Sequence, residues 1–346
     1  RSRCQGIRTH WNRMNLIIPM AGRGSRLRPH TLTVPKPLVH VAGKPIVQRL
    51  VEDLAAMTPR PFDHIAFVIG DFGPAVEADL LALADSLGAT GHIRHQEQPL
   101  GTAHAVWCAE DLLEGETVVA FADTLFRADF ALDPSADGHL FVKRIEDPRQ
   151  FGVVVLDGDG VIREYAEKPE EPVSDLAMIG IYHFKDGAGL RREIGKLIDG
   201  DVRKGGEFQL PDALRALTEQ GDRFLPGEVS AWMDCGNRKV TVETNGRVLE
   251  FMGDEAKVHD GATVEDSIIL PPCEILPGAT IRHSVVGPRV TVGPDTAIER
   301  SVVRDSLIGG HTTLDGVHLD GAMIGHHARV VRRAGDLSVG DYCEIE

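Results

Sequence analysis

The first two thirds of the chain alternate between two patterns of apolar residues. Short continuous apolar runs, at 16–18 and 65–69, are typical of buried strands. Stretches with helical spacing of apolar residues follow them, at 44–57 and 73–87. Such alternation predicts a mostly parallel α/β sheet, in which ligands bind beyond the carboxyl ends of the strands. Polar residues that directly follow predicted strands are therefore the first candidates for a functional site.

Later segments continue this pattern. Residues 106–113 and 239–251 have helical spacing, and residues 117–122 and 139–143 are predicted to be extended. Residues 151–166 predict a hairpin that turns at an Asp-Gly-Asp-Gly sequence. This hairpin interrupts the α/β alternation, as an insertion that covers a substrate would.

Beyond about residue 253, apolar residues recur every six positions and small residues follow them. A fixed short period indicates a solenoid, and a six-residue period resembles the left-handed β-helix of hexapeptide repeats. Each triangular rung of such a helix buries one aliphatic residue per side, and we expect about four or five rungs. We therefore expect two domains, at 14–252 and 253–346. The apolar positions that carry the period are Val286, Val292, Ile298, Ile308, Leu314, Ile324 and Val330.

The chain has 346 residues and a formal net charge of −15. This charge argues against nonspecific binding of nucleic acid or of an anionic membrane surface as the main function. No apolar run approaches the length of a membrane span, and residues 1–13 lack the apolar core of a signal peptide, so we expect a disordered leader there. The five cysteines are scattered and form no CxxC pair, which predicts a reducing, cytoplasmic environment without disulfides.

A glycine-containing loop follows the first predicted strand and is the strongest candidate for binding phosphate. Gly22 and Gly24 let the backbone pass close to a ligand and direct N–H groups toward it. Arg26 adds a planar cation, and Lys36 lies between two prolines. A Walker loop would need a lysine after the second glycine, and a dinucleotide-binding fingerprint would need a third glycine where Leu27 stands. The remaining alternative is a plain glycine turn with solvated basic residues.

The joined motif resembles that of the sugar-phosphate nucleotidylyltransferases. These enzymes have a strand, then A-G-x-G-[ST]-R-[LM]-x-P, and then P-K-P about ten residues on, and residues 21–37 fit this pattern. The resemblance covers nearly everything from Met14 onward. It implies a Rossmann-like nucleotidyltransferase domain followed by a short left-handed β-helix, with Arg26 and Lys36 as catalytic residues. The implied nucleotide-binding residues of this loop are Met20, Ala21, Gly22, Gly24 and Ser25.

A second segment, 96–103, carries a glutamine five residues before a glycine. Gln96 can donate and accept hydrogen bonds at once, which suits the edge of a pyrimidine. In the nucleotidylyltransferases a glutamine with this spacing reads the base, so the resemblance assigns Gln96, Gly101 and Thr102 to nucleotide binding. On its own, the segment also fits a polar loop that starts a helix.

Two aspartates and a Glu-Lys-Pro segment complete the implied site. Asp123 directly follows a predicted strand, and Asp234 lies in a W-x-D-x-G segment like that of the family. Mg²⁺ takes one or two carboxylates together with phosphates, so the resemblance assigns both aspartates to one Mg²⁺ ion, although each alone also fits a turn or a cap. The family's sugar site uses a glycine and a later Glu-Lys-Pro, which on its own would be a surface ion pair. The implied sugar-phosphate residues are Gly152, Glu167, Lys168, Met178 and Gly180.

The implied reaction transfers a nucleotidyl group from a nucleoside triphosphate to a sugar 1-phosphate and releases pyrophosphate. We expect dTTP or UTP as the donor and glucose 1-phosphate as the acceptor. The glycine loop is one residue shorter than in bacterial glucose-1-phosphate thymidylyltransferases, as in many uridylyl- and guanylyltransferases. A GTP:mannose-1-phosphate guanylyltransferase is therefore an alternative.

Two further alternatives belong to other classes. A non-catalytic homologue that binds nucleotide sugars and regulates a partner would be expected to lose Arg26, Lys36 or one of the two aspartates, yet all are present. An acyltransferase activity of the solenoid would need a base, for which the candidates are His311, His318, His326 and His327. Solenoid histidines are more often turn or surface residues, so we favour a role of the solenoid in forming a homo-oligomer.

Overall fold

The computed structural model describes residues 13–22, 24–171 and 173–345, so the predicted leader lies outside the described residues except for Arg13. The chain forms two compact packing units. The first combines the described residues up to Gly22 with Leu50–Trp232, and the second combines residues 24–49 with the described residues from Met233 onward. The predicted domain limits, 14–252 and 253–346, divide the chain by sequence order and stay a prediction.

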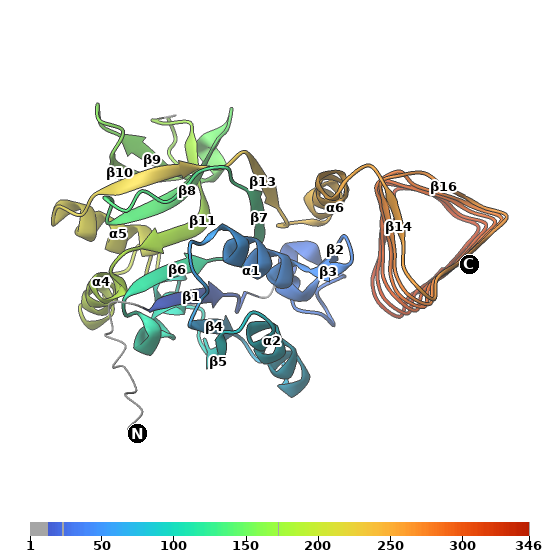
Figure 1. Ribbon diagram of the computed structural model, residues 1–346, viewed down its shortest axis with the longest axis horizontal. Helices are drawn as coiled ribbons and strands as arrows, with labels where there is room; N and C mark the ends of the chain where they lie inside the picture. Colours follow the sequence, from blue (N-terminus) through green and yellow to red (C-terminus); the bar gives the residue numbers. More distant parts are fainter. Residues whose placement is uncertain (1–12, 23, 172, 346) are drawn as a thin grey trace, which may run out of the picture. The chain divides into compact units, whose positions relative to one another are not determined.

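A nine-stranded sheet forms the centre of the first unit (Figure 1). β1 (Met14–Pro19) is buried at every position, as its continuous apolar run predicts. It pairs in parallel with β4 (His64–Ile69) and β6 (Glu116–Ala120), and β4 pairs in parallel with β5 (Thr90–His95). The mostly parallel α/β core expected from the sequence is thus confirmed.

Antiparallel strands extend this sheet beyond β6. β11 (Leu176–Phe184) runs antiparallel to β6 and to β8 (Gly138–Arg144), and β12 (Phe224–Glu228) pairs in parallel with β8. The predicted hairpin over 151–166 is confirmed as β9 (Gly152–Leu156) and β10 (Ile162–Glu167). Two short strands outside this sheet are β7 (Thr124–Arg127) and β13 (Ala231–Asp234).

The helical predictions over 44–57 and 73–87 are confirmed, but the one over 106–113 is wrong in its limits. Helix α3 begins directly after Gly101, which supplies a φ of 114° at the helix start, and ends at Trp107. The apolar residues Leu112 and Leu113 are buried by a following 3-10 turn instead. Among the described residues, none of the helices is long and apolar enough to cross a membrane. The helices are α1 (Ile46–Met57), α2 (Pro74–Ser86), α3 (Thr102–Trp107), α4 (Gly187–Asp199), α5 (Leu210–Glu219) and α6 (Arg238–Met252).

In the second unit, residues 24–49 fold against α6 and the solenoid. Asn245 on α6 is fully buried, and its Oδ1 accepts hydrogen bonds from the backbone N of Ala42 at 2.8 Å and from Thr291 Oγ1 at 2.7 Å. One side chain therefore fastens this segment to both the helix and a solenoid strand. The segment's own elements are 3-10 turns at Ser25–Leu27 and Lys36–Leu38 and a hairpin of β2 (His40–Val41) and β3 (Lys44–Pro45).

The solenoid consists of three parallel sheets, consistent with the expected left-handed β-helix (Figure 1). Two sheets hold six strands and one holds five, so the expectation of four or five rungs was too low. On the first rung Val258 and Val264 pair with the buried Ile275 and Ile281 of the next rung but are themselves exposed. Every apolar position that we assigned to the six-residue period is confirmed as core, with at most 1% of its surface exposed.

The strands of the solenoid are short, at two or three residues each. The first sheet contains β14 (Ala256–Val258), β17 (Cys273–Ile275), β20 (Val290–Val292), β23 (Leu307–Ile308), β26 (Met323–Ile324) and β29 (Ser338–Val339). The second contains β15 (Thr263–Glu265), β18 (Thr280–Arg282), β21 (Ala297–Glu299), β24 (Thr313–Asp315), β27 (Arg329–Val331) and β30 (Glu344–Ile345). The third contains β16 (Ile268–Ile269), β19 (Val285–Val286), β22 (Val302–Arg304), β25 (His318–Asp320) and β28 (Ala334–Gly335).

Candidate functional site

Strand β11 brings together three groups of residues that the sequence assigned to the site. It pairs with β6, whose chain continues to Asp123, and with β9, which begins at Gly152. It also carries Met178 and Gly180 itself. Residues separated by more than fifty positions in the sequence thus meet along one strand of the first unit.

Gly180 shapes the contact between β11 and the segment that leads to Asp123. Its φ of 82° lies in the left-handed region that favours glycine, and the pairing register shifts between Met178 and Tyr182. The Gly180 carbonyl accepts a hydrogen bond from the backbone N of Phe121 at 2.9 Å. The irregularity of β11 therefore fixes the chain two residues before Asp123.

Gly152, Glu167 and Met178 pack too closely for any side chain at position 152. Gly152 pairs with Glu167 across the β9–β10 hairpin. A β-carbon at Gly152 would lie 2.7 Å from Glu167 Oε2 and 2.7 Å from Met178 Cε. Lys168 adopts a φ of 45°, and its Nζ lies 3.8 Å from Glu167 Oε1 on the exposed side. Four of the five predicted sugar-phosphate residues are thus neighbours.

The pKa of Tyr182 connects the predicted metal residue with the predicted sugar residues. This tyrosine is buried on β11, and burial raises the pKa of its hydroxyl. The negative charges of Glu167 and Asp123 raise that pKa further. Both carboxylates therefore act on the same buried ring.

Trp232 is a residue of this site to which the sequence analysis gave no role. Its Nε1 donates a hydrogen bond to Thr124 Oγ1 at 3.1 Å. Its ring meets the ring of Phe151 edge-on, with centroids 4.8 Å apart. It thus joins the segment after Asp123 to the residue before Gly152. The signal was present in the W-x-D-x-G pattern, from which we had used only the aspartate.

The candidate base-reading segment is held by contacts within the protein. Gln96 Nε2 lies 3.3 Å from the Gly101 carbonyl oxygen and 3.1 Å from His104 Nδ1. Burial and, second, the charge of Arg203 lower the pKa of His104, so its Nδ1 can accept a hydrogen bond at neutral pH. Both amide hydrogens of Gln96 are then used, which leaves its Oε1 as an acceptor for a ligand. The sequence analysis did not single out His104.

Gly101 and Thr102 have packing roles of their own. A β-carbon at Gly101 would overlap the carbonyl oxygen of Phe208 and lie 2.8 Å from its backbone N. Thr102 Oγ1 accepts a hydrogen bond from the backbone N of Leu210 at 2.9 Å. The resemblance assigns Gly101 to nucleotide binding, and the close approach of the chain at Phe208 is by itself a sufficient reason for glycine there.

The glycine loop begins in the first unit with Met20, Ala21 and Gly22. The backbone N of Met20 donates to the Val68 carbonyl at 2.8 Å, which continues the pairing of β1 with β4. A β-carbon at Gly22 would meet nothing within 4 Å. This glycine is therefore open to solvent, as a position that approaches a ligand would be.

Gly24, Ser25, Arg26 and Lys36 lie in the second unit. Gly24 has a φ of 59°, and a β-carbon on it would lie 2.7 Å from the β-carbon of Lys36. The close approach of these two residues requires glycine. Ser25 and Arg26 are exposed on the 3-10 turn, whereas Lys36 is only 7% exposed.

Asp234 also lies in the second unit, where its carboxylate is packed against Gly236. A β-carbon at Gly236 would lie 2.8 Å from Asp234 Oδ2, so this glycine leaves room for the carboxylate. Asp123 and Asp234 both offer the oxygen ligands that Mg²⁺ prefers. Among the described residues, no group of three or more His, Cys, Asp and Glu side chains is arranged to hold a metal ion. Each aspartate has the chemistry of a Mg²⁺ ligand, in a shell that phosphate and water would complete.

The four histidines considered as acyltransfer bases do not form one site. His318 belongs to β25 in the third sheet, whereas His311 and His327 stack at a corner with centroids 4.7 Å apart. His326 Nδ1 accepts a hydrogen bond from the backbone N of Gly310 at 2.9 Å.

Comparison with known proteins connects these observations. The sequence profile of the family described as "Nucleotidyl transferase" matches residues 16–250. The chain belongs to the nucleotidyl transferase family. A second profile, described as "GlmU-like, C-terminal hexapeptide", matches residues 244–319. The family resemblance inferred from the sequence is thus confirmed, both for the nucleotidyltransferase part and for the hexapeptide-repeat part of the chain.

Curated relatives in this family act on different sugars and bases, as their names state. The chain is 30% identical over 363 residues to a glucose-1-phosphate thymidylyltransferase of Streptomyces griseus, covering 96% of this chain and 99% of that one. It is 32% identical over 269 residues to the low-salt glycan biosynthesis nucleotidyltransferase Agl11 of Haloferax volcanii, covering 74% and 72%. It is 32% identical over 238 residues to the mannose-1-phosphate guanylyltransferase catalytic subunit beta of Danio rerio, covering 65% and 62%.

A solved structure agrees on the fold. A putative glucose-1-phosphate thymidylyltransferase from Bacillus anthracis in complex with a sucrose superposes with a TM-score of 0.57 at 24% identity, covering 68% of this chain and 94% of that one. Members of the nucleotidyl transferase family bind a nucleoside triphosphate and a sugar phosphate, and they generally use a divalent metal.

Proposed function

We propose that this chain transfers a nucleotidyl group from dTTP or UTP to a sugar 1-phosphate, with glucose 1-phosphate as the favoured acceptor. The observation that carries the proposal is the meeting of Gly152, Glu167 and the Asp123 segment along β11. The thymidylyltransferase of Streptomyces griseus, which aligns over nearly the whole of both chains, supports the choice of substrates.

The reaction is attack by a sugar 1-phosphate oxygen on the α-phosphorus of the triphosphate. A phosphate monoester is largely a dianion at neutral pH, since its second pKa is about 6, so no general base is needed. The difficulty is the repulsion between two polyanions. Asp123 and Asp234 would hold Mg²⁺, whose charge reduces that repulsion. Arg26 would bind the leaving pyrophosphate, and Lys36 and Lys168 would bind the phosphates that react.

The remaining residues bind and orient the substrates in this proposal. The loop from Met20 to Ser25 would bind the triphosphate with its backbone N–H groups. Gln96 would accept a hydrogen bond from the base through Oε1, beside Gly101 and Thr102. Glu167 would bind sugar hydroxyls, while the backbone of Met178 and Gly180 would complete the pocket.

A pyrophosphate-release assay of the full chain tests the proposal. We expect Asp123→Asn and Arg26→Ala each to lower turnover by about 100-fold or more, because each removes charge stabilisation of the reacting phosphates. Asp129→Asn is a matched control, since this exposed aspartate lies outside the site. Near-normal turnover of either site variant would refute its assignment.

The substrate pair requires its own measurement. A matrix of dTTP, UTP and GTP against glucose 1-phosphate and mannose 1-phosphate identifies the preferred pair. The shorter glycine loop and the guanylyltransferase relatives make GTP with mannose 1-phosphate the second candidate. Absence of turnover with every pair, together with nucleotide-sugar binding, would support the non-catalytic regulatory alternative.

We propose a cytoplasmic homo-oligomer as the working form. Sugar phosphates and nucleoside triphosphates are cytoplasmic metabolites, which supports the location. The exposed Val258, Val264 and Ile268 on the first rung of the solenoid support the assembly, because exposed apolar groups favour contacts between chains. Light scattering of the purified chain measures its mass, and a strictly monomeric mass would contradict this assembly.

A further inference from the structure

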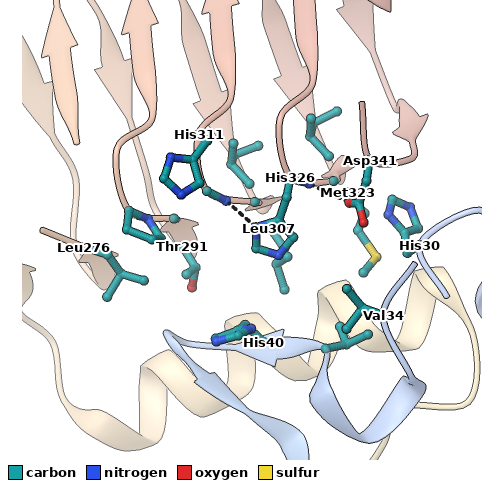
Figure 2. Close-up of a pocket in the computed structure, with 18 of the residues that line it drawn as sticks. His30, Val34, His40, Leu276, Thr291, Leu307, His311, Met323, His326 and Asp341 are labelled. Carbon is teal, nitrogen blue, oxygen red and sulfur yellow. Dashed lines mark hydrogen bonds between the residues drawn. The ribbon is translucent and has the colours of Figure 1, made fainter. Parts of the chain in front are cut away.

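A cavity of about 400 Å³ lies within the second unit, between the solenoid and residues 30–43 (Figure 2). At the last rung, His30 Nε2 lies 3.2 Å from Ser338 Oγ, and Thr33 Oγ1 donates to the carboxylate of Asp341. At an earlier rung, the hairpin is fastened through Asn245 to Thr291, as described above. Between these two attachments the segment and the solenoid leave the cavity.

The part of the cavity wall formed by strands β20, β23 and β26 is mostly apolar. Thr291, Leu307 and Met323 occupy paired positions on adjacent strands β20, β23 and β26. Their exposed fractions are 2%, 6% and 2%, although outward positions of a solenoid strand ordinarily face water. Val34 lines the opposite side (Figure 2), and Val39 also lines the cavity. A mostly apolar lining with a few polar groups is typical of small-molecule sites.

Glycines at the rim have a different explanation. Gly293, Gly309 and Gly325 also line the cavity. A β-carbon on each would collide with the backbone of the next rung. Stacking of the rungs therefore accounts for these glycines, and they carry no argument for a ligand.

Four histidines line the cavity, namely His30, His40, His311 and His326. His326 enters from the solenoid and His40 from the hairpin, with ring centroids 6.1 Å apart (Figure 2). His326 Nδ1 accepts the Gly310 N–H, so in the neutral ring Nε2 carries the proton and is a donor. Burial lowers the pKa of His326, and it lowers the pKa values of His40 and His30 to about 4. These three imidazoles are therefore uncharged at neutral pH.

The charged side chains of the cavity lining offer little to a charged ligand. Among the described residues that line the cavity there is no lysine or arginine. The carboxylate of Asp341 already accepts hydrogen bonds from the backbone N of His326 at 2.6 Å and from Thr33. The described lining thus offers phosphorylated compounds such as the proposed substrates no lysine or arginine to bind, so the ligand belongs to another class.

We propose that this cavity binds an uncharged aromatic heterocycle, whose ring packs on Leu307 and Met323 and whose ring nitrogen accepts a hydrogen bond from His326 Nε2. Val34 and Val39 stand on either side of the turn that contains Lys36. An occupied cavity therefore stabilises one position of that turn and changes turnover. This second part rests on the proposed function, whereas binding itself does not.

Calorimetric titration of the full chain with benzimidazole at pH 8 tests the binding. Benzimidazole is uncharged there and offers one acceptor nitrogen, while indole has the same shape with a carbon at that position. We expect one saturable site for benzimidazole with a dissociation constant of about 1 mM or lower. Indole should bind about fivefold more weakly, since it cannot accept the hydrogen bond. Benzoate, an anion of similar size, should not bind.

Two variants and one control locate the site. Leu276→Trp places a large side chain in the cavity and should abolish binding. His326→Phe keeps a ring but removes the donor, so benzimidazole should bind no better than indole. Val302→Trp adds the same ring on β22, outside the cavity, and should bind like the parent. Melting temperatures report whether each variant is folded, and the two site variants test the cavity independently.

Two results would overturn the binding proposal: no saturable benzimidazole binding, or equal binding by the parent chain and a folded Leu276→Trp variant. Turnover in the pyrophosphate assay tests the second part. We expect benzimidazole to change the turnover of the parent chain and not that of Leu276→Trp. Binding without any change in turnover would refute the coupling to Lys36 alone. A parent chain without turnover would speak against the proposed function, while the calorimetric result would still stand.

Discussion

The strand β11 region of the first unit and the solenoid of the second unit differ in which residues occupy their special backbone positions. Around β11, two glycines meet separate needs: Gly180 has a left-handed φ of 82°, whereas a β-carbon at Gly152 would collide with Glu167 and Met178. In the solenoid, left-handed corners are occupied by larger residues such as Asp295, His311 and Tyr342. Aspartate and histidine tolerate this conformation better than most residues, and a corner side chain points away from the core.

This difference predicts how well each region tolerates substitutions. At a solenoid corner the rungs repeat, and stacked rings such as His327 on Tyr342, at 4.8 Å, support the turn from neighbouring rungs. Around β11 each contact occurs once. A substitution around β11 should therefore remove one specific contact that nothing else replaces. A substitution in the solenoid should weaken one rung, while the neighbouring rungs keep the same kind of contact.

The largest expected effect is that of Gly101→Ala. The new β-carbon would overlap the Phe208 carbonyl in a backbone with a φ of 114°, so both strain and collision oppose folding. We expect the free energy of unfolding to fall by about 3 kcal/mol or more. Gly22→Ala is the matched control, because its β-carbon would meet nothing within 4 Å. Urea unfolding followed by circular dichroism measures both, and equal stabilities would show that the chain at Phe208 moves freely.

A core substitution in the solenoid tests the other side of the comparison. Ile298 is 1% exposed, and Ile298→Ala should lower the free energy of unfolding by about 2–5 kcal/mol through lost burial and a cavity. Pyrophosphate release per folded molecule should remain normal, since this residue belongs to the solenoid core and has no role in the proposed site. Val302→Ala, at a position 37% exposed, should change stability by less than about 0.5 kcal/mol. Loss of turnover by folded Ile298→Ala would show that the solenoid core and the site are coupled.

The sequence predicted those parts of the fold that leave a local or periodic signal. The buried strand β1 and the six-residue period from Val286 to Val330 follow directly from apolar patterning. The neighbourhood of Gly152 and Glu167 followed from a motif, and their roles stay a prediction. Motifs identify residues by type and spacing, so they find functional residues that lie close together in the sequence.

Contacts between distant segments left no such signal. The position of His30 beside Ser338 joins residues 308 positions apart, and neither belongs to a period or a motif. Trp232 was visible in a motif, but its partner Thr124 was not deducible because only the folded sheet brings them together. The cavity of the second unit was likewise beyond the sequence, since its polar groups come from segments with unrelated patterns.

Acid sensitivity provides a second comparison of the two units. Burial lowers the pKa of His40 in the second unit, and that of His139 in the first, to about 4. His326 and Arg49 face His40, whereas His183 and Asp133 face His139. Between pH 6.5 and about 4 the unfolded chain binds a proton at each histidine that the folded chain does not. Stability should therefore fall as the pH falls through this window and be unaffected by these groups above it.

Replacing either histidine should flatten this pH dependence. In His40→Phe or His139→Phe, the slope of unfolding free energy against pH should decrease by about 1 kcal/mol per pH unit inside the window. Glu116 behaves differently, because its hydrogen bonds with His183 and then Arg60 hold its pKa at about 2. Its contribution to stability is therefore constant above about pH 4.5 and is lost as the pH falls from there toward 2. Urea unfolding at several pH values measures the slopes. An unchanged slope in both variants would mean that these histidines are protonated in the folded chain.

The smallest expected effect concerns His104, which acts through Gln96. In His104→Phe the ring shape remains, but Gln96 loses the acceptor that fixes its amide. The amide can then rotate and present its NH₂ group to the base, so the Michaelis constant for the triphosphate should rise about five- to tenfold while kcat stays the same. His104→Asn restores an acceptor and should recover part of the loss. A fall in kcat without a change in the Michaelis constant would contradict a positioning role and place the effect in the packing of α3.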